Sequence, residues 1–339
     1  MEDFESVSFT PLLDTLEVKD ISDEEYFGDS YKDYISNSRL ALINPEQDGS
    51  PKDFFEGLSK HSKYSDSLYF GSAVHTLVLQ PNDFILIDSV DRPTAKAGFM
   101  ADELYSKSGK VPSNEDIIKA SNKIDYYKGK MDEKKIEDLK TKCYKYWRNR
   151  ALFEHKYEDP KTPIYLDPKS REKLQLCLDS INRNKRIQKL LHPDFIIEEP
   201  ISLNEQTVLL DVEATVGEEK TLLKLKAKFD NYTISKEDNV VTLNDLKTTG
   251  HFTSEFKNSW NKYHYYRQAG MYMWLLSLLA QKCYGISNPV LKGNMLLIST
   301  VPKYYSDVFE ITKKEFLRGF AEFKKLLKMV AYYKVNGYE

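Results

Sequence analysis

Two acidic residues and a lysine stand on neighbouring predicted strands. In VVTLNDLKTTG, residues 240–250, a period of two places the apolar side chains on the same face as Asp245 and Lys247. Charged groups beside a core cost free energy unless they are paired or used. The preceding strand KTLLKLKAKFDNYTI, residues 220–234, carries Asp230 on its polar face. A reversal at SKEDN would therefore bring Asp230 beside Asp245, with Lys247 one pleat further on.

This arrangement suits a hard divalent cation next to a fixed positive charge. Carboxylate oxygens are the ligands that Mg²⁺ prefers, and such a cation assists phosphodiester hydrolysis by neutralising charge and acidifying a bound water. A lysine close to two carboxylates stays protonated, so Lys247 fits an electrostatic role better than that of a base. For an isolated D-x-K pair, a structural salt bridge on a sheet face is the commoner explanation.

Four motifs in one order resemble the PD-(D/E)XK nuclease superfamily, and within it the RecE or exodeoxyribonuclease VIII-type exonucleases of phage recombination. GSAVHTLVLQPNDF at 71–84 is similar to the family's helix with a glycine and a histidine before an apolar run. KAKFD at 226–230 is similar to its basic-x-basic-x-D strand, and DLKTT at 245–249 to its D-x-K-T-T strand end. Gln268 and Tyr272 match its Q-x-x-x-Y helix. Because YISNSRLALI also resembles the family's opening helix, the resemblance runs from Tyr34 to the C-terminal helix.

The resemblance implies a role for each matched residue. His75, Asp230 and Asp245 would bind the metal, and Asp230, Asp245 and Lys247 would be catalytic. The resemblance also implies residues that either contact and orient the metal ligands or position DNA, namely Gln268, Tyr272, Lys226, Lys228 and Thr248. Glu199 is a weaker match to a further acidic position. The expected cofactor is Mg²⁺ or Mn²⁺, with two ions per site.

Purely structural roles also explain several of these residues. A lone histidine on an apolar helix face, such as His75, is commonly a hydrogen-bonded core residue. Gln268 and Tyr272 lie one helical turn apart and could simply belong to a packed face. The lysines beside Asp230 could equally contact phosphates or be solvated.

The resemblance also implies an activity and partners. The implied activity is that of an exonuclease that degrades one strand of linear double-stranded DNA from its end, in the 5′-to-3′ direction. The implied partner is a single-strand annealing protein, and the implied assembly is a ring-shaped homo-oligomer around DNA. Two alternatives remain: an endonuclease of the same superfamily, and a non-catalytic DNA-end-binding protein with a degenerate nuclease core. The second requires a lost ligand, whereas His75, Asp230, Asp245 and Lys247 are all present.

The order of elements predicts an α/β (α+β) fold. Helices come first, and from about Phe195 strands, a helix, a strand and a final helix follow. We therefore expect a restriction-endonuclease-like core, with a central mixed β-sheet flanked by helices and a helical N-terminal half. Residues 1–30 are expected to form a flexible acidic arm. Residues 31–339 are expected to form one domain with a charged helical insertion at about 94–150.

Charge is distributed unevenly along the chain. Residues 1–30 hold ten acidic residues against Lys19, so this segment carries −9 while the total is −3. The remaining body is therefore mildly basic, which is compatible with a nucleic-acid partner. Residues 119–150 hold eleven Lys or Arg against five Asp or Glu, interleaved with tyrosines. A solvated helical face explains that stretch as well as a DNA surface does.

Cysteine spacing and hydropathy exclude several classes of protein. Cys143, Cys177 and Cys283 form no CxxC pair, which argues against a disulfide framework, a zinc ribbon and the iron–sulfur branch of the superfamily. The longest apolar run, MYMWLLSLLA, is half the roughly 20 residues of a membrane span. The acidic start also lacks the basic region of a signal peptide. We therefore expect a cytoplasmic protein with no membrane partner.

Overall fold

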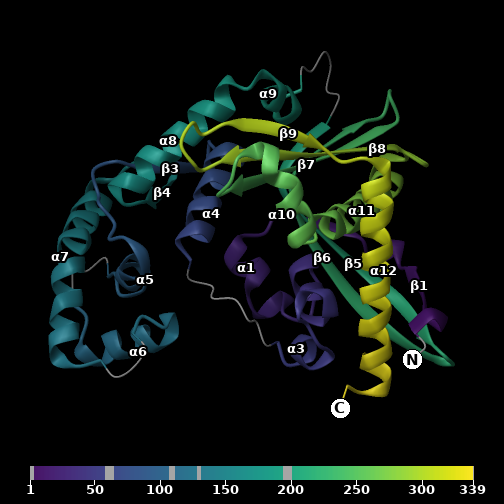
Figure 1. Ribbon diagram of the computed structural model, residues 1–339, viewed down its shortest axis with the longest axis horizontal. Helices are drawn as coiled ribbons and strands as arrows, with labels where there is room; N and C mark the ends of the chain where they lie inside the picture. Colours follow the sequence, from purple (N-terminus) through teal and green to yellow (C-terminus); the bar gives the residue numbers. More distant parts are fainter. Residues whose placement is uncertain (1–3, 58–64, 107–110, 128–130, 194–200, 339) are drawn as a thin grey trace. The chain divides into compact units, whose positions relative to one another are not determined.

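The computed structural model describes residues 4–57, 65–106, 111–127, 131–193 and 201–338 (Figure 1). The chain divides into two compact units, each with a core of its own. The sheet unit comprises Met1–Lys60 and Ile181–Glu339, and the helical unit comprises His61–Ser180.

Within the described residues, the sheet unit carries one seven-stranded sheet in the order β1-β5-β6-β7-β8-β9, with β2 also paired to β5. Only the β7–β8 pair is parallel among these ladders, so the sheet is mixed as predicted. The strands are β1 (Ser8–Pro11), β2 (Glu17–Lys19), β5 (Ile201–Val216), β6 (Glu219–Ser235), β7 (Val240–Thr249), β8 (Val290–Ser299) and β9 (Ser306–Glu310).

Helices cover both faces of this sheet, which confirms the predicted architecture of a mixed sheet flanked by helices. On one face α11 (Tyr265–Tyr284) and α12 (Lys313–Asn336) pack into the main core with apolar residues of β5 to β8. On the other face Asn244 donates to the Leu190 carbonyl of α9 (Lys185–Leu191) at 3.1 Å. The shorter helices are α1 (Asp23–Phe27), α2 (Asn37–Leu40), α3 (Pro51–Phe55) and α10 (Phe256–Lys262).

The predicted hairpin between β6 and β7 forms at SKEDN. The Ser235 hydroxyl accepts from the Asp238 N–H at 3.2 Å, and Asn239 adopts a left-handed conformation with φ 54°. Asparagine tolerates this conformation because its short side chain bonds locally. The chain therefore reverses at the polar residues 235–239, as the sequence predicted.

A row of asparagines fixes the register of four strands. Asn204, Asn231, Asn244 and Asn294 lie side by side on β5, β6, β7 and β8. On β6, β7 and β8 the asparagine side-chain N–H donates to the side-chain oxygen of the asparagine on the preceding strand, at 2.7, 2.7 and 2.9 Å respectively. A one-residue slip would break this row of buried hydrogen bonds. The row therefore holds β6 and β7 in the register on which the candidate site depends.

The acidic segment expected to be a flexible arm is folded in its described part, residues 4–30. β1 and β2 pair with β5, and α1 follows them. Apolar residues between the acids are buried, among them Val7, Leu16, Ile21 and Tyr26. Burial of this apolar surface favours docking in spite of the segment's net charge.

The helical unit is larger than the predicted insertion at 94–150. It comprises α4 (Asp66–Leu79), β3 (Phe84–Ile87), α5 (Ala95–Glu103), α6 (Asn114–Ile124), α7 (Glu133–Lys156), β4 (Thr162–Tyr165) and most of α8 (Pro168–Arg183). The parallel β3–β4 pair joins residues from both sides of the charged stretch, so these flanks belong to the same unit. Tyr146 and Trp147 are in its core, whereas Tyr144 is exposed. No described helix is both long and apolar enough to cross a bilayer.

Candidate active site

The C-terminal half of β7 presents a buried carboxylate held from two sides. Asp245 is 2% exposed, and its Oδ2 lies 2.5 Å from Lys247 Nζ. Its Oδ1 accepts from Gln268 Nε2 on α11 at 2.9 Å. Both Asp245 and Lys247 point to the α11 side of the sheet because residues i and i+2 of a strand share a face. The structure thus brings together three residues that the motifs indicated.

Asp230 lies on β6 at the position next to Asp245. The β6–β7 ladder covers Asn231–Ser235 and Val240–Asn244, so Asp230 and Asp245 are the next residues on their strands. Beyond this ladder, the Asp230 carboxylate accepts from the Leu246 N–H at 2.7 Å. The backbone N–H of Leu246 thus bonds to a side chain and not to the backbone of β6. This bond fixes Asp230 beside β7.

The strand pair β5–β6 is irregular at Asp230. Phe229 and Tyr232 both belong to the main core, with ring centroids 5.6 Å apart, although strict alternation would place them on opposite faces. On β5, the opposite residue Glu205 has φ 54°. Such irregularities re-aim side chains and are common beside active sites. Here the irregularity directs Asp230 toward β7.

Glu205 is a site residue that the motifs did not indicate. Its carboxylate oxygen lies within 4.8 Å of one from Asp230. A sequence signal was available, because the two-residue turn at Gly217–Glu218 sets the β5–β6 register in which Glu205 faces Asp230. The weaker match to a further acidic position of the family is Glu199, which lies outside the described residues.

The charges of the site depend on one another. Burial alone would lower the pKa of Lys247, but the carboxylates of Asp245 and Asp230 outweigh it and raise that pKa above its usual value. Burial raises the pKa of Asp230, an effect that Lys247 and the Leu246 N–H oppose. Lys247 is therefore protonated in the metal-free protein, which agrees with an electrostatic role.

Lys228 and Lys226 are held inside the protein. Lys228 Nζ lies 2.9 Å from Glu205 and 2.6 Å from Asp23 of α1. Lys226 is buried, and its Nζ donates to the carbonyls of Tyr26 and Tyr31 at 2.6 and 3.0 Å. These contacts bind the N-terminal segment to β6. They fit structural roles better than the DNA contacts that the resemblance implied.

Thr248 and Tyr272 also differ from the expectation. Thr248 is adjacent to Lys247 on β7, so its side chain lies on the opposite face of the sheet from Asp245 and Lys247. Tyr272 is buried against Phe229, edge to face at 5.0 Å. Burial raises its pKa well above the usual value. Tyr272 thus packs against Phe229 of β6. In the described contacts, Gln268 hydrogen-bonds to the Asp245 carboxylate and Tyr272 does not.

His75 lies on α4, in the helical unit. The carboxylates lie in the sheet unit. Participation of His75 in the same metal site therefore stays a prediction from the sequence.

The donor set of the sheet unit fits a hard divalent cation. Glu205, Asp230 and Asp245 offer carboxylate oxygens, the ligand type of Mg²⁺ and Mn²⁺. The raised pKa of Asp230 shows that burial disfavours its negative charge, which a bound cation would offset. Glu205 and Asp230, whose oxygens lie within 4.8 Å of one another, would hold the cation, and Asp245, which Lys247 and Gln268 fix at the position next to Asp230, is the third candidate ligand.

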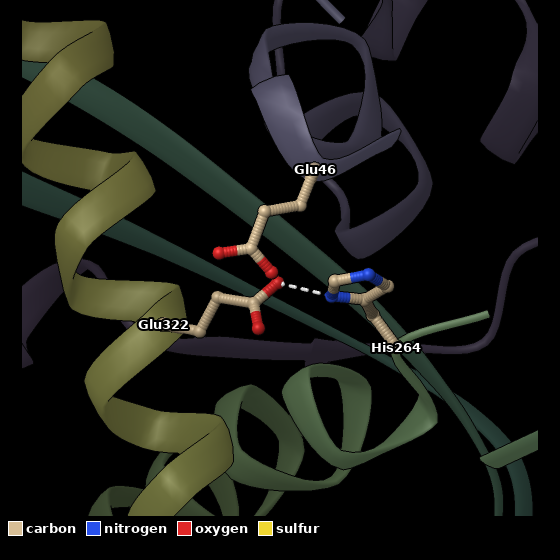
Figure 2. Close-up of side chains that lie close together, drawn as sticks. All are labelled: Glu46, His264 and Glu322. Carbon is tan, nitrogen blue, oxygen red and sulfur yellow. Dashed lines mark hydrogen bonds and ion pairs between the residues drawn. The ribbon is translucent and has the colours of Figure 1, made fainter. Parts of the chain in front are cut away.

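A second group of potential ligands lies at the start of α11 (Figure 2). Donor atoms of Glu46, His264 and Glu322 lie within 4.8 Å of one another, and His264 Nδ1 is 2.7 Å from Glu322 Oε1. The same oxygen accepts from Arg267 at 3.2 Å and from Asn44 at 3.1 Å. Because Arg267, Asn44 and His264 all contact Glu322 Oε1, we interpret this network as one that fixes the start of α11, the helix that carries Gln268.

Comparison with known proteins gives little beyond this geometry. No protein-family model matches the chain. No curated protein sequence matches it either. One similar solved structure is that of an exonuclease candidate from Eubacterium rectale, covering 95% of this chain and 89% of that chain, with a TM-score of 0.46 and 10% sequence identity. Similarity at this level does not assign a function.

Proposed function

We propose that this protein is a divalent-cation-dependent deoxyribonuclease. The observation that carries the proposal is the environment of Asp245, a buried carboxylate held between an ammonium group at 2.5 Å and an amide at 2.9 Å, next to Asp230. A salt bridge with only a structural role needs neither the second aspartate nor Glu205 at the same place. The order of motifs along the chain supports the same proposal.

Each residue has a distinct role in this proposal. Asp230, Asp245 and Glu205 bind Mg²⁺ or Mn²⁺, which when bound supplies charge neutralisation at the phosphodiester and a more acidic water. Gln268 fixes the orientation of the Asp245 carboxylate. Lys247, kept protonated by the two aspartates, stabilises the negative charge that develops on the phosphoryl oxygens as water attacks in line.

The finer proposal is an exonuclease that degrades one strand of linear double-stranded DNA from its end. The resemblance supports it, together with 5′-to-3′ polarity, two ions per site, a single-strand annealing partner and a ring-shaped assembly. The test is incubation of end-labelled linear duplex with and without Mg²⁺, followed by sizing of the products. Mononucleotides released from one end only in the presence of Mg²⁺ are expected, and intact duplex in both samples would contradict the nuclease.

A covalently closed plasmid separates the two nuclease alternatives. An exonuclease needs an end and leaves the circle intact, whereas an endonuclease cuts it. Digestion of circles as fast as of linear DNA would replace the exonuclease proposal by the endonuclease one. Binding of DNA ends without cleavage under either condition would favour the non-catalytic alternative.

A further inference from the structure

The loops that follow β7 and β8 lie at the edge of the sheet nearest Lys247. The two strands are parallel, so their C-terminal ends meet at one edge. The Thr300 N–H donates to the Thr249 carbonyl at 2.8 Å, and the Ser299 hydroxyl donates to the His251 carbonyl at 2.9 Å. These bonds join the two loops at the end of β7 that carries Lys247.

These loops expose three aromatic side chains. Phe252 and Tyr263 are each 49% exposed and Tyr305 is 55% exposed. Phe252 precedes the helical segment that ends in α10, and Tyr263 follows it. Single exposed aromatic residues are ordinary, and three in these loops make this end of the strands a candidate interaction surface.

A line of rings leads from the candidate site to this surface. Lys247 Nζ lies 5.5 Å from the centroid of the Tyr265 ring, and the Tyr265 and Tyr263 rings lie 5.7 Å apart. Tyr265 is held in place by stacking on Phe256, at 5.8 Å with an interplanar angle of 11°. Tyr265 is thus a fixed inner ring, and Tyr263 is the exposed outer ring.

A lysine at Tyr263 favours an anionic ligand. Lys262 Nζ lies over the Tyr263 ring, 5.3 Å from its centroid. Lys257 of α10 is already paired with Glu315 of α12 at 2.5 Å, so Lys262 is the lysine that would contact a ligand at Tyr263. An exposed ring with a lysine beside it matches the two parts of a nucleotide, because a base stacks on the ring while the ammonium group contacts a phosphate.

We propose that Tyr263 is a stacking surface for a nucleobase of the DNA strand whose phosphodiester lies at Lys247, with Lys262 contacting the backbone. This inference rests on the proposed nuclease function, since it places the strand relative to the cleavage site. Every base has a π-face, so the surface accepts any sequence, as a nuclease that proceeds along a strand requires.

Binding of a short fluorescein-labelled oligothymidylate, followed by anisotropy at fixed salt, tests the stacking surface. All variants carry Asp245→Asn, so that no cleavage occurs. Tyr263→Ala is expected to weaken binding about tenfold, as the loss of one stacked base predicts. Tyr263→Phe keeps the ring and is expected to bind like its parent, while Tyr263→Leu, apolar but not aromatic, is expected to resemble alanine.

Tyr338→Ala is the matched control. Tyr338 is also exposed, but it follows the last turn of α12, whereas the first turn of that helix contacts α10 through Glu315 and Trp260 at 3.0 Å. A helix of 24 residues is about 36 Å long, so Tyr338 is remote from Tyr263. Tyr338→Ala is expected to leave binding unchanged.

Kinetics separate this inference from the nuclease proposal. With Asp245 intact, Tyr263→Ala is expected to raise KM for linear duplex about tenfold and to change kcat much less. If the wild type digests DNA while Tyr263→Ala keeps both its KM and its oligonucleotide affinity, the stacking surface is wrong and the nuclease stands. If the wild type digests nothing but Tyr263→Ala still loses affinity, the surface stands and the nuclease is wrong.

Discussion

At the scale of single residues, the site depends on a lysine whose charge is secured by two carboxylates. Asp245 lies 2.5 Å from Lys247, and both aspartates raise the lysine's pKa in spite of its burial. The ammonium group also faces the Tyr265 ring, which adds a favourable cation–π contact. The chemistry open to Lys247 is therefore stabilisation of negative charge.

The first prediction concerns the pH dependence of cleavage. In the metal-free protein the carboxylates of Asp245 and Asp230 outweigh burial and raise the pKa of Lys247 above the usual lysine value of about 10.4, and we expect the residue to keep its proton from pH 7 to 10 during cleavage. We expect no loss of kcat in this range from its deprotonation, and Lys247→Met is expected to lower kcat by about 100-fold or more at every pH. A wild-type decline near pH 8 that Lys247→Met abolishes would instead assign a low pKa to this lysine.

The second prediction concerns Glu205. If Glu205 binds the cation, Glu205→Gln should raise the Mg²⁺ concentration for half-maximal cleavage by about 10- to 100-fold, because the amide lacks the negative charge. Glu213→Gln is the matched control, since Glu213 lies on the same strand and pairs with exposed Lys220. Equal Mg²⁺ dependence in Glu205→Gln and the wild type would remove Glu205 from the site.

The sequence predicted part of the site because part of it is local. Asp245 and Lys247 share a face through strand periodicity alone, and Asp230 joins them through one turn. Glu205 depends on a second register and on a positive φ, neither of which the motifs describe. Lys226 could not be recognised as structural, because its partners are carbonyls in the distant N-terminal segment.

At the scale of elements, α11 is positioned by an unusually close contact with α12. A Cβ on Gly319 would lie 1.7 Å from the Tyr266 carbonyl oxygen, and a Cβ on Gly270 would lie 2.2 Å from the Phe320 nitrogen. Both obstacles are backbone atoms, which cannot move aside as a flexible side chain can. Close packing of these helices therefore requires glycine at both positions.

The third prediction follows from this contact. Gly319→Ala is expected to lower the free energy of unfolding by about 1–3 kcal/mol or more, because α11 and α12 must separate. Gly250→Ala is the control, since a Cβ there meets nothing within 4 Å and the backbone is not left-handed. Urea unfolding measures both variants. Equal stability of Gly319→Ala and the wild type would show that the helices do not approach so closely.

The fourth prediction concerns the attachment of the N-terminal segment to β6. Burial, and then the charge of Arg39, lower the pKa of Lys226 to about 8. Between pH 8 and the unfolded value of about 10.4, the unfolded chain binds more protons at this residue than the folded chain does. The contribution of Lys226 to the free energy of unfolding therefore rises with pH across this window.

Urea unfolding of the wild type and Lys226→Met at pH 7.5 and 9.5 checks this sign. The stability of the wild type relative to the variant is expected to be greater at pH 9.5. A difference that is the same at both pH values would mean that Lys226 titrates at its ordinary pKa in the folded protein.

At the scale of the whole molecule, the mixed sheet could be predicted but the division of the chain could not. Alternating strands, a turn cluster and amphipathic helices gave the sheet and its flanking helices. The boundary of the helical unit depends on the β3–β4 pair, whose strands have only four residues each and lie far apart in sequence. The prediction that residues 1–30 form a flexible arm was based on their net charge. The few apolar residues of that segment are buried, and they are enough to dock it.

The most direct test of the account is metal-dependent digestion of end-labelled linear duplex by Asp245→Ala. Glu237→Ala is the control, since it removes an exposed acid from the turn of the same β6–β7 hairpin. With folding verified by circular dichroism, the account predicts that Asp245→Ala loses Mg²⁺-dependent cleavage while Glu237→Ala and the wild type release nucleotides at equal rates. Undiminished cleavage by folded Asp245→Ala would contradict it.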